Sequence, residues 1–202
     1  MLTTREAIDL RRSIRKFRAD SVPEDILYEL LDAARLAPSG SNAQPWRFKI
    51  VRDENTKKQL AKAAYDQSFI AEAPVVIVCC ADIEGYLKGL VSGLQDLGMI
   101  GAVEDRIVHI IIDRTERMKA LNLEQFGQRI AFNVAIAIEH IVLRSLDFGL
   151  GTCWVRLIDE QAIRTIFGWD ETVSVVALLP LGYPDESPAP RRRRTIEEII
   201  IK

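Results

Sequence analysis

Residues 74–80 read Pro-Val-Val-Ile-Val-Cys-Cys. Every position after the proline is apolar, and most of the run is β-branched. An unbroken run of this kind is typical of a strand that is buried on both faces. Residues 173–181 have the same character and predict a second buried strand. Residues 46–51 alternate between apolar and polar side chains, which predicts a half-buried strand, and residues 152–155 predict a short one.

Helical patterns are interleaved with these strands. Residues 24–34 place Ile26, Leu27, Leu30, Leu31 and Ala34 on one face. Further helices are predicted at about residues 55–64 and 123–146, and at 159–167 with Asp159 as the cap. The interleaving indicates an α+β or α/β fold. Without an internal repeat or a dividing linker, residues 1–202 are expected to form one domain.

Local signals predict where several helices begin and end. Thr3-Thr4-Arg5-Glu6 fits a capping box that opens a short helix, and Ser21-Val22-Pro23-Glu24 repeats the pattern. Gly149 is expected to end the long helix as a C-terminal cap. Residues 82–122 are less legible because five glycines are mixed with charged pairs, and residues 107–112 fit a strand or a helix.

Bulk composition excludes several classes of protein. The chain has 202 residues, of which 48% are hydrophobic and 28% charged, with a net charge of −2, so no chain-wide field for nucleic acid is expected. The longest apolar stretch, residues 73–81, is too short to cross a bilayer. The first residues lack the apolar region of a signal peptide, so the expected location is the cytoplasm. Three cysteines and two histidines form no metal-binding pattern, and no metal site is predicted.

Two arginine clusters lie near opposite ends of the chain. Residues 11–15 read Arg-Arg-Ser-Ile-Arg, and residues 191–194 are four arginines. If the first cluster ends a helix, Arg11 and Arg15 share a face and Arg12 points elsewhere. Arginine grips a phosphate through planar paired hydrogen bonds, so converging clusters would hold a phosphorylated ligand. A solvated helix end and a nucleic-acid-binding tail are the alternatives.

Residues 37–46 form a second unusual segment, Ala-Pro-Ser-Gly-Ser-Asn-Ala-Gln-Pro-Trp. Its small residues allow a planar ligand close to the backbone, and its two side-chain amides suit the mixed edge of a heterocycle. A plain helix-to-strand connection is the alternative. The Gly-x-Gly at residues 149–151 is weak evidence for a phosphate loop because the longer dinucleotide-binding pattern is absent.

Taken together, these motifs resemble the FMN-dependent nitroreductase family. They are Arg-Arg-Ser-x-Arg-x-Phe near the start, Pro-Ser-x-x-Asn-x-Gln-Pro-Trp after the next helix, Gly-Leu-Gly-Thr-x-Trp, and the last arginine cluster before Glu-Glu-Ile. The resemblance runs from about Thr4 to Ile201. It implies a three-layer α/β/α sandwich of the α+β class, with a mixed, mainly antiparallel central sheet, in an intertwined homodimer. Residues 82–122 would be the variable substrate-side segment, and residues 190–202 an arm on the partner subunit.

The resemblance also implies a set of FMN contacts. The first cluster would meet the phosphate, the ribityl chain and the pyrimidine edge through Arg11, Arg12, Ser13 and Arg15. The second would close on the phosphate through Arg191 and Arg193. The ring would be lined from the second subunit by Pro38, Ser39, Gly40 and Asn42. Gln67 would add a polar contact, and backbone N–H groups of Trp154, Val155 and Arg156 would lie beside the ring edge that carries N5 and O4.

The activity implied is transfer of reducing equivalents from NADH or NADPH, through FMN, to a nitroaromatic, quinone or similar small acceptor with ping-pong kinetics. No protein side chain is expected to be an essential acid. Reductive dehalogenation, flavin fragmentation and a non-catalytic flavin-binding or sensing role are the alternatives. Two residues depart from the family: Arg156 stands where many relatives have a small residue, and Asn133 replaces a common acidic one. His140 is interpreted as a satisfied core histidine.

Overall fold

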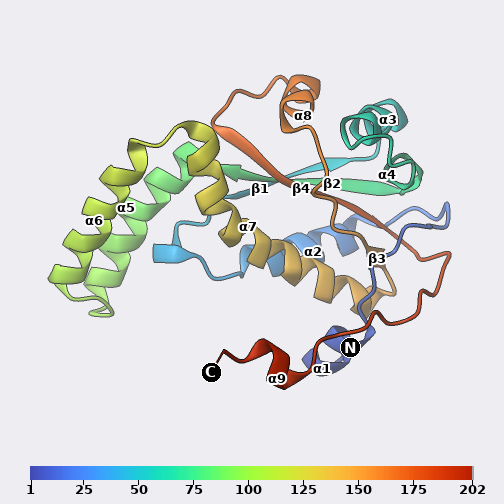
Figure 1. Cartoon of the computed structure of the whole chain (residues 1–202), viewed down its shortest axis with the longest axis horizontal. Helices are drawn as coiled ribbons and strands as arrows, with labels where there is room; N and C mark the ends of the chain where they lie inside the picture. The colour runs from blue at the N-terminus through green and yellow to red at the C-terminus, as the bar shows by residue number, and fades with distance from the viewer. Residues whose placement is uncertain (202) are drawn as a thin grey trace.

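A computed structural model of the chain describes residues 1–201, and its centre is the strand β2 (Val75–Asp82). The sheet has the order β1-β2-β4-β3, with β1 at Trp46–Val51, β4 at Val173–Gly182 and β3 at Gly151–Thr152 (Figure 1). All pairs between these strands are antiparallel, and a parallel bridge joins Ser13 to Thr152. The mainly antiparallel sheet is confirmed.

Alternate residues of β2 enter two different cores, as a strand of period two requires. Ile77 and Cys79 pack in the core beneath α2 (Glu24–Arg35) and α7 (Leu123–Ser145). Val76 and Val78 pack in the other core, beneath α3 (Glu54–Ala63), α4 (Phe69–Glu72) and α8 (Glu160–Phe167). The strand is therefore buried on both faces, and the fold has the three layers expected of the α+β class.

The first capping box forms and the second does not. Glu6 N donates to Thr3 Oγ1, and Thr3 N donates to Glu6 Oε2, at the start of α1 (Thr4–Leu10). The prediction of a second box at Ser21 was wrong. The N-cap of α2 is Pro23, with φ −58° and no side-chain cap bond. Proline already has the φ needed at a helix start, and helix α2 begins directly after it.

Residues 82–122 fold as a pair of helices that projects from one end of the sheet, α5 (Ile83–Met99) and α6 (Asp105–Lys119) (Figure 1). Residues 107–112 are therefore helical. Glycines let α5 approach the loop at residues 39–44. A Cβ atom at Gly89 would lie 2.3 Å from Ala43 O, and one at Gly93 would lie 1.7 Å from Ser41 O. Two of the five glycines of this segment, Gly89 and Gly93, thus serve close helix-to-loop packing, whereas Gly98 and Gly101 would meet nothing within 4 Å.

The remaining elements are short. The 3₁₀ turn η1 (Gly40–Asn42) follows α2 in the chain, and η2 (Leu146–Phe148) follows α7. The short helix α9 (Ile196–Ile199) lies near the C-terminal end of the described residues. Gly149 has φ +68° and is the C-cap of η2, whereas the long helix α7, which it was expected to end, already stops at Ser145. The strand predicted over 152–155 is shorter than expected: β3 ends at Thr152, and beyond it Cys153 N donates to Pro180 O and Val155 forms an isolated bridge with Leu178. None of the helices described is long and apolar enough to span a membrane.

Candidate functional site

Both ends of the chain line a single hollow of about 750 Å³, which we name the arginine cavity. Its polar lining comes from the two arginine clusters and from one serine and one aspartate beside them. Three residues of the proline-rich loop and one isoleucine complete the wall. The lining residues are Ile8, Asp9, Arg11, Arg12, Ser13, Arg15, Pro188, Ala189, Pro190, Arg191 and Arg193. Six of the predicted site residues are thus brought together within one chain.

The first cluster is extended and not helical, so the predicted helix face was wrong. Helix α1 ends at Leu10, and Arg11 already has φ −55° and ψ 128°. Ile14 N donates to Thr152 O at 2.9 Å, which fixes the segment beside β3. In extended backbone, alternate side chains share a side. Arg11, Ser13 and Arg15 lie at alternate positions and all line the cavity, while Ile14 between them is buried; Arg12 also lines the cavity and does not follow this alternation.

The two ends of the chain are joined by a short backbone ladder next to the cavity. Asp185 N donates to Lys16 O at 2.9 Å, and Arg18 N donates to Tyr183 O at 2.9 Å. Phe17 forms an antiparallel bridge with Pro184 between these bonds. The guanidinium of Arg18 also lies over the Tyr183 ring, 5.1 Å from its centroid. This ladder places the two arginine clusters on facing walls.

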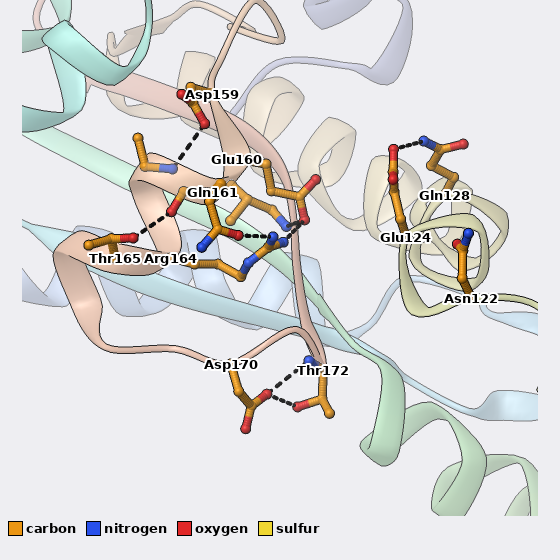
Figure 2. Close-up of polar contacts among 12 residues, drawn as sticks. Asn122, Glu124, Gln128, Asp159, Glu160, Gln161, Arg164, Thr165, Asp170 and Thr172 are labelled. Atoms are coloured by element: carbon orange, nitrogen blue, oxygen red, sulfur yellow. Dashed lines mark hydrogen bonds and ion pairs between the residues drawn. The ribbon is translucent and has the colours of Figure 1, made fainter.

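Positive charge in the cavity is not neutralised by the protein. None of the ion pairs between described residues involves the five lining arginines, and the one lining carboxylate, Asp9, pairs with Arg5 at 3.5 Å. Arg12 Nη1 donates only to the carbonyls of Asp9 and Arg11, each at 2.8 Å. Elsewhere the chain does pair its arginines: Arg164 of α8 contacts Glu160 and Gln161, each at 2.7 Å (Figure 2). An anion is therefore the expected occupant of the cavity.

The backbone after β3 offers hydrogen-bond donors along one edge. Cys153 N donates to Pro180 O at 3.2 Å and Val155 N to Leu178 O at 2.9 Å, both toward β4. Successive N–H groups of a strand point in opposite directions, so those of Trp154 and Arg156 point away from β4. Within residues 1–201 these two amides donate no hydrogen bond. Of the three backbone N–H groups expected beside a flavin, that of Val155 is used within the sheet, and those of Trp154 and Arg156 remain open.

Gln67 is held by its own surroundings. Residues Tyr65 and Asp66 take left-handed conformations with φ of 57° and 59°, and they turn the chain after α3. Gln67 Nε2 then donates to Ala64 O at 2.9 Å and to Leu157 O at 3.3 Å. Its side-chain donors are thus used in joining this turn to the segment after Arg156. Any ligand contact would have to come from its carbonyl oxygen.

The loop at residues 38–44 does not line the arginine cavity of its own chain. It is strained, with φ of 51° at Ser41 and Asn42 and 46° at Gln44. Gln44 Nε2 donates to Asn42 Oδ1 at 3.1 Å. Among the described residues, the Asn42 Nδ2 donor and the Gln44 Oε1 acceptor therefore remain unused. Pro38, Gly40 and Asn42 are exposed, so this edge faces outward.

The side chain of Asn133 holds the loop at residues 38–44 in place. It lies buried in α7, where its Oδ1 accepts from Gly40 N at 3.1 Å and its Nδ2 donates to Ile130 O at 3.2 Å. A carboxylate in place of this amide could accept the first bond but could not donate the second. His140 Nδ1 lies 3.0 Å from Ala33 O, as interpreted for a structural histidine.

Comparison with known proteins identifies the family. A family model described as "Nitroreductase family" matches residues 8–183. The chain belongs to the nitroreductase family. A protein named NADH dehydrogenase from Thermus thermophilus is 35% identical over 211 residues, which span 100% of this chain and 96% of that protein.

Solved structures of the family have the same fold. A nitroreductase-like protein from Streptococcus mutans is 25% identical, with a TM-score of 0.79 over 98% of this chain and 97% of its own. A protein from Exiguobacterium sibiricum solved in complex with FMN is 21% identical, with a TM-score of 0.80 over 100% of this chain and 98% of its own. At that identity the second comparison supports the fold alone.

Sequence reasoning missed part of the site. It did not include the apolar side of the cavity, Ile8 with Pro188 and Pro190, nor the Asp9 carboxylate. It also missed Glu186, whose Oε1 accepts hydrogen bonds from Arg15 N and Lys16 N. Prolines that flank an arginine cluster were a usable signal, because they stiffen the chain that carries the charges. Glu186 had no local signal, since its partners lie 170 or more residues away.

Proposed function

We propose that the protein is an FMN-dependent oxidoreductase that takes reducing equivalents from NADH or NADPH and passes them to a small acceptor such as a nitroaromatic or a quinone. The observation that supports this proposal is the convergence of five arginines, unpaired by carboxylates among the described residues, on one cavity. The relative named NADH dehydrogenase supports a nicotinamide reductant. Ping-pong kinetics, with reductant and acceptor using the site in turn, is part of the proposal.

The donor set fits a phosphate-bearing flavin. Guanidinium groups bind a phosphate through paired, charge-assisted hydrogen bonds, and Ser13 adds a hydroxyl. Arg11, Arg15, Arg191 and Arg193 would hold the phosphate, while the amides of Trp154 and Arg156 would donate along the adjoining edge. FMN supplies the hydride chemistry when bound, and the protein supplies position and charge. Burial raises the pKa of the Cys153 thiol next to this segment, so it stays neutral.

The complete site is proposed to form between two subunits. All four of the loop residues expected at the flavin lie outside their own chain's cavity, and three of them, Pro38, Gly40 and Asn42, are exposed, while Ser39 is half-buried. This edge is therefore available to a second copy. Ile196, Ile199, Ile200 and Ile201 expose more than half of their surface near the end of the chain. Apolar side chains exposed at this density are expected to pack on another surface. We therefore assign residues 190–202 as an arm on the partner subunit.

Absorption spectroscopy tests the proposed function. The purified protein, supplied with FMN and freed of excess, is expected to be yellow, and its visible band is expected to bleach anaerobically on adding NADH or NADPH. Adding a nitroaromatic or quinone should then restore the band. Bound FMN that neither nicotinamide reduces would instead indicate a flavin-binding protein without turnover.

Arg156 is expected to influence which acceptor is used. It is exposed, it makes no ion pair among the described residues, and its backbone N–H lies on the open edge after β3. A fixed positive charge there should favour anionic acceptors over neutral ones. In Arg156→Gly, kcat/KM for an anionic nitroaromatic should fall several-fold relative to a neutral analogue, and high salt should shrink the difference. Equal relative rates in the two proteins would refute this role.

A further inference from the structure

The carboxylate of Glu186 lies beside the arginine cavity but does not line it. It is half-buried, and its Oε1 accepts hydrogen bonds from the backbone N–H groups of Arg15 and Lys16, the latter at 3.1 Å. No ion pair between described residues includes Glu186, so the carboxylate does not neutralise a guanidinium of the cavity. The carboxylate instead accepts hydrogen bonds from the backbone of the segment that carries Arg15.

Without Glu186, these two N–H groups would have no acceptor in the described chain. The neighbouring backbone bonds, Ile14 N to Thr152 O, Asp185 N to Lys16 O and Arg18 N to Tyr183 O, hold residues 14, 16 and 18, and among the described residues they leave Arg15 without a backbone partner. A hydrogen bond to an ionised acceptor is stronger than a neutral one, and two donors share this oxygen. Glu186 therefore fixes the middle of the segment, where Arg15 projects into the cavity.

The same residue also controls the opposite wall. Only Ser187-Pro188-Ala189-Pro190 separates Glu186 from Arg191. Proline locks φ near −65°, so a link with two prolines transmits position better than a flexible one. The backbone ladder ends at Asp185, so the bonds from Arg15 N and Lys16 N to Glu186 extend it by one residue towards Arg191 and thereby help to set the separation of Arg15 from Arg191 and Arg193. The bonds and the link together are called the Glu186 clasp.

We propose that Glu186 is a positioning residue for the arginine cavity, which holds the two arginine clusters at the separation that one phosphate group requires. This inference rests on the proposed function, because it takes the FMN phosphate as the occupant. Binding of a phosphate by arginines is strong only when the donors are pre-arranged, since otherwise their ordering opposes binding. Glu186 does that ordering without touching the ligand.

The test uses the full-length protein, freed of flavin, and titrates FMN by quenching of its fluorescence. Glu186→Ala is expected to raise the Kd about tenfold, which corresponds to losing hydrogen bonds to one charged acceptor. Glu186→Gln keeps an oxygen acceptor and should restore the Kd to within about threefold of the wild type. The matched control is Asp185→Ala, because Asp185 has the same charge and lies next in the chain, but its side chain makes no bond among the described residues.

Amide hydrogen exchange gives a second readout that does not depend on FMN. The Arg15 and Lys16 amides should exchange faster in flavin-free Glu186→Ala than in Glu186→Gln or Asp185→Ala. If Glu186→Ala does not fold, Glu186→Asp keeps the charge, withdraws the oxygens by one methylene and should show the same two effects. Failure of the wild type to bind FMN refutes the proposed function, whereas the exchange data still test the clasp.

Three outcomes would overturn the inference. Glu186→Ala could bind FMN as tightly as Asp185→Ala does. Both Glu186→Ala and Glu186→Gln could bind FMN more tightly than the wild type, in which case the carboxylate only repels the phosphate. Unchanged exchange of the Arg15 and Lys16 amides would show that the hydrogen bonds do not order the segment.

Discussion

Replacing Arg11 and Arg15 together with alanine is expected to abolish practical FMN binding. Both side chains line the arginine cavity from the same side of one extended segment. Each charge-assisted bond to a phosphate contributes about 1.5–3 kcal/mol, so the pair should cost about 3 kcal/mol or more, which is over a hundredfold in Kd. Titration of the flavin-free protein with FMN at fixed ionic strength measures the loss.

A matched double variant separates the loss of direct contacts to the phosphate from the loss of net positive charge. Arg35 and Arg52 are arginines outside the cavity, and each pairs with an acidic residue that does not line it, Asp32 at 2.7 Å and Glu24 at 2.6 Å. Arg35→Ala with Arg52→Ala removes the same formal charge but no contact in the cavity, so only a small, salt-screened change in the Kd is expected. Equal weakening by the two double variants would mean that the arginines act as a general field and not as ligands.

Gly93→Ala is expected to have the largest effect on the loop that is proposed to serve the second subunit. A Cβ atom at residue 93 would lie 1.7 Å from Ser41 O and 2.9 Å from Ser41 C, both of which are backbone atoms. Helix α5 and the loop therefore have to separate. Overpacking of this kind costs typically about 1–3 kcal/mol, and denaturant unfolding should show a loss at the upper end of that range or above it.

Gly98 in the same helix supplies the control. A Cβ atom there would meet nothing within 4 Å. The same substitution should therefore stabilise the protein by up to about 1 kcal/mol, as alanine is the better helix former. Opposite signs at residues 93 and 98 would confirm that contact with the loop decides the effect. Destabilisation at both positions would contradict this explanation.

Elements with strong local signals were predictable from the sequence. The β-branched run at residues 74–80 became the central strand, and the Asp159 cap placed the start of α8, where its Oδ1 accepts from Ala162 N at 2.9 Å. The long helix and the alternating strand at residues 46–51 were found for the same reason. In each case the repeat of apolar side chains, and the residues that mark where the element begins or ends, lie close together in the chain.

Features set by distant partners were not predictable. Gly89 and Gly93 of α5 resemble turn signals, yet they allow a loop some fifty residues earlier to lie against the helix. Residues 11 and 15 share a side in a helix and also in an extended segment. The sequence therefore predicted correctly that Arg11 and Arg15 lie together, but it predicted a helical backbone where the segment is extended. The donors at Trp154 and Arg156 became visible only once the pairing of Cys153 and Val155 with β4 was known.

The outer edge of β1 has a consequence for solubility. Among the described residues β1 pairs only with β2, so one row of its backbone groups lacks a strand partner. Arg47 and Lys49 point outward from this strand, and Arg47 is held by an ion pair with Asp82 at 2.9 Å. Charged side chains on an edge strand oppose the addition of another strand. This row of charge is therefore expected to keep the sheet from growing into ordered aggregates.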